Sequence, residues 1–178
     1  MKEFLEKIGL IDHFTTTIEV EKDTFISKFE AQVKEARIDV FLENPFDVFS
    51  SDKATYKGHV GFNGFRIKRR RKIFDIKSGF PIIAEGSFVQ KGKMLIIETR
   101  INGIPLFFQL IYSLMILMFV FWILSTLLTK YIDLNTLLTL LYLLLMPIII
   151  IAHYFAIRDA VRNLKKDLER DFFDWSKP

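Results

Sequence analysis

The sequence of 178 residues contains no cysteine. This absence excludes disulfide bonds, thiolate metal ligands and cysteine nucleophiles, and it agrees with a reducing compartment. The N-terminal stretch MKEFLEKIGLIDHF also lacks a continuous apolar segment and a small-residue cleavage site. We therefore expect no secretory signal at this end of the chain.

Recognisable catalytic motifs are missing as well. The three histidines, His13, His59 and His153, lie far apart, and no two of them have the i, i+4 spacing of a helical metal site. The stretch GHVGFNG has the glycines of a phosphate-binding loop but lacks the Gly-Lys-Ser/Thr ending, and it falls at an expected hairpin turn. No serine, histidine and acid stand in a known nucleophile context. We expect no catalytic residue, no metal and no cofactor, and therefore a function other than catalysis.

Charge is absent from two long runs. Residues 104–128 and 134–157 contain no Asp, Glu, Lys or Arg. Each run exceeds the roughly 20 residues that a helix needs to cross a bilayer. The five residues TKYID between them cannot form a domain, so the sequence predicts an antiparallel transmembrane hairpin.

The basic residues near the ends of these runs predict the orientation of the hairpin, because cytoplasmic flanks carry an excess of Lys and Arg. The connecting loop has only Lys130. The flanks outside the hairpin carry Lys91, Lys93, Arg100, Arg158, Arg162, Lys165, Lys166 and Arg170. Residues 1–103 and the C-terminal segment are therefore expected on the cytoplasmic side.

The first part of the cytoplasmic segment predicts a strand followed by a helix. Residues 14–20 are rich in β-branched side chains, which favour a strand. Residues 23–36 carry Phe25, Ile26, Phe29 and Val33 at helical spacing, which is typical of an amphipathic helix.

Four further strand-like runs follow a linker that contains Pro45. They comprise residues 55–62, 65–71, 82–90 and 93–101. Asn63-Gly64 is a strong hairpin signal between the first two, and Lys91-Gly92 marks a turn between the last two. The expected fold class is an α+β cytoplasmic domain, an antiparallel β-meander with one helix, over residues 1–103.

The last segment, residues 158–178, predicts an amphipathic helix that continues from the second apolar run. Its apolar side chains recur every three or four residues and share one face: Val161, Leu164, Leu168, Phe172 and Trp175. Acidic residues nearly balance the basic ones, whereas helices on membrane surfaces are usually cationic. Packing on the β-domain is therefore favoured over packing on the membrane.

Polar residues inside the predicted hairpin are few. If the turn is centred near Tyr131, Gln109 and His153 lie at equal depth near the cytoplasmic interface. These two side chains could form either an interhelical hydrogen bond or a proton-sensitive or ligand-binding site. Both runs lack the polar stripe that a conducting helix needs, so a pore is the weaker alternative.

Six basic residues crowd one predicted strand: Arg66, Lys68, Arg69, Arg70, Arg71 and Lys72. By strand alternation Arg66, Lys68, Arg70 and Lys72 face outward, while Arg69 and Arg71 have the inward parity, where an unpaired charge is prohibitive. A strand that overhangs the sheet, a bulge or an opening for an anion would each accommodate them. The run suits anionic lipid headgroups, a merely solvated or topology-setting stretch, or another anionic ligand. Nucleic acid is an unlikely partner at a net charge of +4.

The order YKGHVGFNGFRIKRR, FPIIAEGSF and LIIETRI before an apolar span resembles small uncharacterised bacterial two-span membrane proteins with a β-rich, pleckstrin-homology-like cytoplasmic domain. The resemblance covers residues 54–157 and implies no activity. It places the chain in the bacterial inner (plasma) membrane. The expected function is that of a membrane-anchored binding module or an accessory subunit of a membrane complex, with anionic lipid, another membrane subunit or a second copy as partner. An oligomerising membrane effector or pore-forming protein is the alternative.

Overall fold

The computed structural model describes residues 2–36, 38, 54–70, 82–104, 106–128 and 134–177. Within these ranges it describes all side chains except those of residues 2, 106–111, 122, 126–128 and 134–143. The elements in chain order are α1 (Lys2–Lys7), β1 (Ile11–Glu19), α2 (Lys22–Glu30), β2 (Val33–Glu35), β3 (Tyr56–Gly61), β4 (Gly64–Arg69), β5 (Ile83–Lys91), β6 (Met94–Asn102), α3 (Leu106–Leu128) and α4 (Leu134–Ser176).

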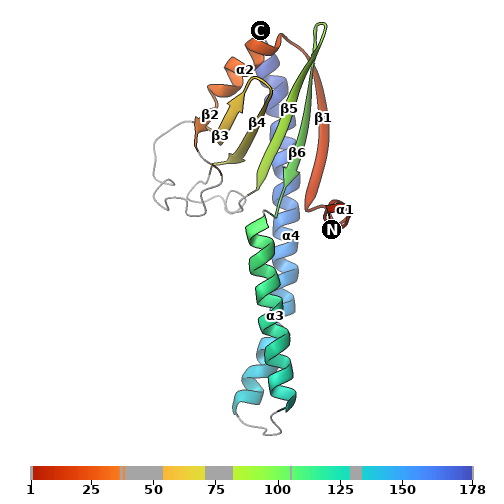
Figure 1. Cartoon of the computed structure of the whole chain (residues 1–178), viewed down its shortest axis with the longest axis vertical. Coiled ribbons are helices and arrows are strands. Elements are labelled where there is room, and N and C mark those ends of the chain that lie inside the picture. The colour runs from red at the N-terminus through yellow and green to blue at the C-terminus, as the bar shows by residue number, and fades with distance from the viewer. Residues whose placement is uncertain are drawn as a thin grey trace.

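The strands form one six-stranded sheet in the order β1-β6-β5-β4-β3-β2. Consecutive strands from β3 to β6 pair in antiparallel fashion, and β1 closes the far side by pairing with β6. The expected α+β class is confirmed, but the expectation of a purely antiparallel meander is wrong, because β2 pairs in parallel with β3. Helix α2 carries the chain from β1 to the opposite edge of the sheet, where β2 begins (Figure 1).

Helix α2 is shorter than the sequence predicts. It ends at Glu30, where the amide of Gln32 bonds the carbonyl oxygen of Phe29 in a tight turn. Val33, which the sequence predicts on the apolar face of the helix, lies in β2 instead. A β-branched side chain gains more from pairing at a sheet edge than from one further helical turn.

Both predicted hairpins are confirmed. Gly61 pairs with Gly64 between β3 and β4, so the two loop residues are Phe62 and Asn63. The turn between β5 and β6 uses Gly92 at a φ of +60°, a backbone conformation that glycine adopts without the strain of a Cβ.

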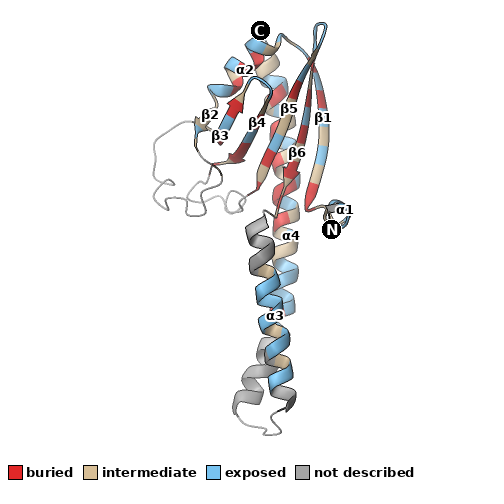
Figure 2. Ribbon diagram, in the orientation of Figure 1, coloured by how far each residue is buried: buried red, intermediate tan, exposed pale blue. Residues whose placement is uncertain are grey.

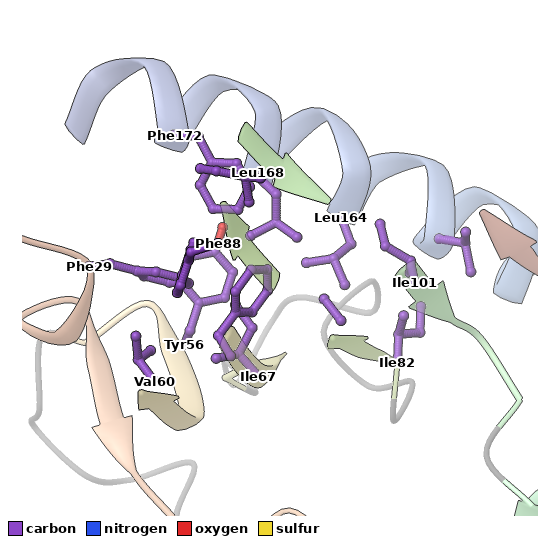
Figure 3. Packing of buried hydrophobic residues seen from close by; sticks show 14 of the residues in the cluster. Phe29, Tyr56, Val60, Ile67, Ile82, Phe88, Ile101, Leu164, Leu168 and Phe172 are labelled. Atoms are coloured by element: carbon purple, nitrogen blue, oxygen red, sulfur yellow. The ribbon is translucent and has the colours of Figure 1, made fainter. Parts of the chain in front are cut away.

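Helix α4 is one continuous element, and its C-terminal part packs across one face of the sheet (Figures 1 and 2). The prediction that this segment packs on the domain is confirmed. The buried side chains of α4 recur at helical spacing: Ile157, Ala160, Val161, Leu164, Leu168 and Phe172. They meet core residues of the strands and of α2, among them Phe29, Tyr56, Ile67, Phe88 and Ile101 (Figure 3).

Aromatic rings dominate the end of this core near the C-terminus. The ring of Phe29 stacks on Trp175 at a centroid distance of 4.8 Å, and it meets Phe172 edge to face at 5.7 Å. Phe172 also lies edge to face with Phe25 and with Phe65, at 5.8 and 5.9 Å. Each such ring pair contributes about 0.5–1.5 kcal/mol of stabilisation beyond that from the apolar area it buries. The aromatic cluster therefore joins α4 both to α2 and to the sheet.

Helix α3 and the first half of α4 extend away from the sheet side by side (Figure 1). Most of their described side chains are apolar and exposed, including Leu114, Leu117, Met118, Phe121, Leu144, Ile148, Ile149 and Phe155 (Figure 2). Among the described side chains, one helical stretch, Leu144–Ser176, is long and apolar enough to cross a membrane, and Tyr112–Ser125 is a shorter apolar stretch. The second span of the predicted hairpin stays a prediction.

Candidate functional site

One end of the sheet, here called the basal edge, lies beside the start of α3. Strand β6 ends there at Asn102. The register continues from Asn102 across the neighbouring strands, one residue from each, through Ile83, Lys68, Lys57 and Lys34. Three lysines thus stand side by side on neighbouring strands, on the face opposite α4. Strands lie about 4.8 Å apart. We call Lys34, Lys57 and Lys68 the basal lysine row.

The predicted solvent-facing stripe on β4 is only partly correct. Arg66 is exposed and forms an ion pair with Glu85 at 2.9 Å. Lys68 and Arg70 are only 8% and 6% exposed, so the expectation that they face solvent is wrong. Alternation along a strand predicts the face of a side chain but not what covers that face. The predicted site residues Arg71 and Lys72 lie outside the described residues.

Arg69 has the inward parity that the sequence predicts, and its partner comes from α4. Its Nη1 lies 2.7 Å from Oδ2 of Asp167, in a contact where both side chains are largely buried. Arg69 therefore does not need an overhanging strand, a bulge or an anion-binding opening to have its charge balanced. The acidic residues of the C-terminal segment are candidate partners for this arginine in the sequence. Only the packing of α4 on the sheet shows that Asp167 is the one that pairs with it.

A buried phenol adds a second polar contact between the sheet and α4. The hydroxyl of Tyr56 donates a hydrogen bond of 2.6 Å to Oδ2 of Asp171, and Arg170 contacts both Asp171 and Asp167. Burial raises the pKa of Tyr56 well above its usual value. The hydrogen bond to Asp171 and the charges of both aspartates raise it further, against a smaller opposing effect of Arg69. The phenol therefore stays protonated and remains a donor, which fits a role in positioning α4.

Of the predicted intramembrane pair Gln109 and His153, the structure describes the side chain of His153 only. The ring of His153 lies against that of Tyr112, with centroids 5.5 Å apart at an interplanar angle of 60°. The side chain of Gln109 lies outside the described residues, so its pairing with His153 stays a prediction. The next residue of α4, Tyr154, donates through its hydroxyl to the carbonyl oxygen of Ile8 at 2.8 Å and connects the N-terminal turn to α4.

The outer face of the sheet, opposite α4, carries an open groove of about 840 Å³ across β1, β6, β5 and β4. Polar side chains from alternate positions line it: His13, Thr15, Arg66, Glu85, Ser87, Glu98 and Arg100. The register places four of them in one row, from His13 through Arg100 and Glu85 to Arg66. No local sequence pattern predicts this groove, because its residues come together only through strand pairing.

Metal ligation has no support in the part of the chain that the structure describes. There, no group of three or more His, Asp or Glu side chains is placed to hold a metal ion. The polar and charged side chains of the groove offer hydrogen bonding and charge complementarity.

Comparison of the chain with protein-family models, with curated proteins and with solved structures finds no match. The resemblance to bacterial two-span membrane proteins therefore stays a prediction.

Proposed function

We propose that this chain is a membrane-anchored binding module. Helices α3 and α4 cross the inner membrane as a hairpin, both termini stay in the cytoplasm, and the basal edge of the sheet faces the anionic leaflet. The observation that carries the proposal is the two-part character of α4. From Leu144 to Phe155 its apolar side chains are exposed, except for the buried Met146 and the partly buried Tyr154. From Ile157 to Phe172 they are buried in the domain core, within the same unbroken helix.

An exposed apolar surface of this extent is costly in water and is stable in lipid. Because α4 is continuous and its C-terminal part is clamped in the aromatic core, the domain cannot swing freely on a linker. Anchoring of α4 therefore holds the sheet in a defined orientation above the bilayer.

This orientation favours contact between the basal edge and lipid headgroups. Asn102 at the end of β6 is two residues before Ile104, where the apolar run begins, and the basal lysine row lies level with Asn102. Each Lys or Arg near an anionic leaflet contributes about 1 kcal/mol of attraction. Lys57 and Lys68 are only 5% and 8% exposed, so Lys34, which is of intermediate exposure, is the most exposed member of the row.

The topology can be tested directly, because the chain has no native cysteine to remove. Single cysteines at Asp133 and, in a separate variant, at Ser176 are probed in intact cells with a membrane-impermeant thiol reagent. We expect labelling of the first and no labelling of the second until the cells are opened. Labelling of the Ser176 variant alone would invert the proposed orientation, and equal labelling of both would remove the hairpin.

Approach of the basal edge to the bilayer gives a second prediction. A spin label on a single cysteine at Thr55, which bonds Arg70 at the basal edge, is expected to collide more with a nickel-chelating lipid in anionic nanodiscs than in neutral ones. The difference in collision rate between anionic and neutral nanodiscs should fall in 1 M salt, because the Debye length decreases from about 10 Å at 0.1 M to about 3 Å at 1 M. Lys34→Gln should reduce this difference.

The matched control for this measurement is a label at Lys93, an exposed turn residue at the opposite end of the sheet. Its collision rate is expected to be low and independent of lipid charge. If the Thr55 label shows no dependence on lipid charge at low salt, the basal edge does not bind the leaflet.

A further inference from the structure

We propose that the outer-face groove is a binding site for a small zwitterion, with Arg100 holding its anionic group and Glu98 holding its primary ammonium. This inference goes beyond membrane anchoring and does not depend on it. It rests on two charges of the groove that have no partner in the described ranges of the chain, on their spacing and on the polar groups around them.

Arg100 is the cationic half of the site. Its Nε atom is buried without a hydrogen-bond partner, and the side chain forms no ion pair with any described residue. The neighbouring carboxylate that would pair with it, Glu85, is engaged instead by Arg66 at 2.9 Å. A buried unsatisfied donor is costly, so an arginine left in this state is a site for an oxyanion such as phosphate or carboxylate.

Glu98 is the anionic half. It lies two residues before Arg100 on β6 and therefore faces the same groove, about 7 Å along the strand. It is exposed, and it forms no ion pair within the described part of the chain. Its register neighbours are Thr15 and Ser87, whose hydroxyls line the groove and add neutral hydrogen-bonding groups.

The charge balance of the groove selects the class of ligand. The pair of Arg66 and Glu85 is internally neutral, so among the described residues that line the groove Arg100 and Glu98 are the cation and the carboxylate without an ion pair. A ligand with a single charge would satisfy one of these groups and face the other as a like charge. A molecule with an anionic group and an ammonium joined by a short chain satisfies both. Phosphoethanolamine, in which an ethylene group links the phosphate to the ammonium, has this form.

The test is calorimetric titration of the full chain in non-ionic detergent with O-phosphoethanolamine. Inorganic phosphate, ethanolamine and phosphocholine are the comparison ligands. We expect O-phosphoethanolamine to bind most tightly. Phosphocholine should bind about tenfold more weakly or worse, because its trimethylammonium group has no N–H to donate to Glu98.

Two variants assign the roles. Arg100→Gln should abolish binding of both O-phosphoethanolamine and phosphate, whereas Glu98→Gln should remove only the preference for the amine. Matched controls are Lys93→Gln at the far turn and Glu19→Gln at the far end of β1, which change the same charges outside the groove. If Arg100→Gln fails to fold, the wild-type preference and Glu98→Gln still decide the question.

The source of the zwitterion is distinguished in nanodiscs. If a lipid headgroup is the ligand, nanodiscs of phosphatidylethanolamine should block soluble O-phosphoethanolamine, and nanodiscs of phosphatidylcholine should not. If a free metabolite is the ligand, neither should block it. Equal affinity for phosphate and O-phosphoethanolamine, no binding at millimolar ligand, or variants that match their controls would each overturn the proposal.

Discussion

Replacement of Phe172 with alanine is expected to lower the free energy of unfolding by about 3–5 kcal/mol. The side chain is fully buried at 0% exposure, and its ring contacts aromatic rings from β1, α2, β4 and α4 itself. Its removal leaves a cavity among rigid rings that cannot collapse to fill it. Denaturant unfolding of the purified chain in detergent measures the loss, with the fluorescence of Trp175 as the signal in a Trp122→Phe background.

The neighbouring residue supplies the matched control. Phe173 carries the same ring one position along α4 but is 55% exposed. Phe173→Ala is expected to change stability by less than about 1 kcal/mol, because surface substitutions away from special features have small effects. Equal losses for the two variants would mean that α4 does not pack on the sheet through this face.

The second large effect concerns which segments make up the folding unit. A chain in which residues 106–152 are replaced by a Gly/Ser linker is expected to fold as a water-soluble domain. Residues 1–103 alone are expected to remain unfolded or to aggregate. The core face of the sheet is covered by α4 from Ile157 to Phe172, so the shorter fragment would expose that face to water.

A short linker is sufficient because the two ends are already neighbours. A Cβ at Gly103, just after β6, would lie 2.7 Å from Cγ2 of Val161 and 2.9 Å from Cγ2 of Ile157, which shows how closely the chain passes α4. A linker of about eight residues has a root-mean-square span of roughly 15 Å, enough to reach the first retained turn of the helix.

Heteronuclear NMR spectra of the two fragments distinguish the outcomes. Dispersed amide signals are expected for the linked domain and collapsed signals for residues 1–103. A well-dispersed spectrum from residues 1–103 would show that the sheet folds without α4.

Local patterns in the sequence were enough to predict most elements. The glycine turns and alternating strands predicted the two hairpins, and the spacing of Val161, Leu164 and Leu168 predicted the buried face of the C-terminal helix. These signals are strong because each depends on residues within a few positions of one another. The predicted end of α2 is wrong because Val33 fits either a helix face or a strand, and the pairing of β2 with β3 decides between them.

Only the tertiary structure decided where the charges lie relative to one another. Alternation assigned Arg69 to the core side, but its partner, Asp167, comes from a helix that returns to the sheet after the apolar segment. The burial of Lys68 and the meeting of Arg100 and Glu98 with Thr15 and Ser87 likewise depend on the register of strands that are distant in the chain. A sequence specifies the face of each strand residue through its period of two, whereas cross-strand neighbours depend on the closure of the whole sheet and on the helix that covers it.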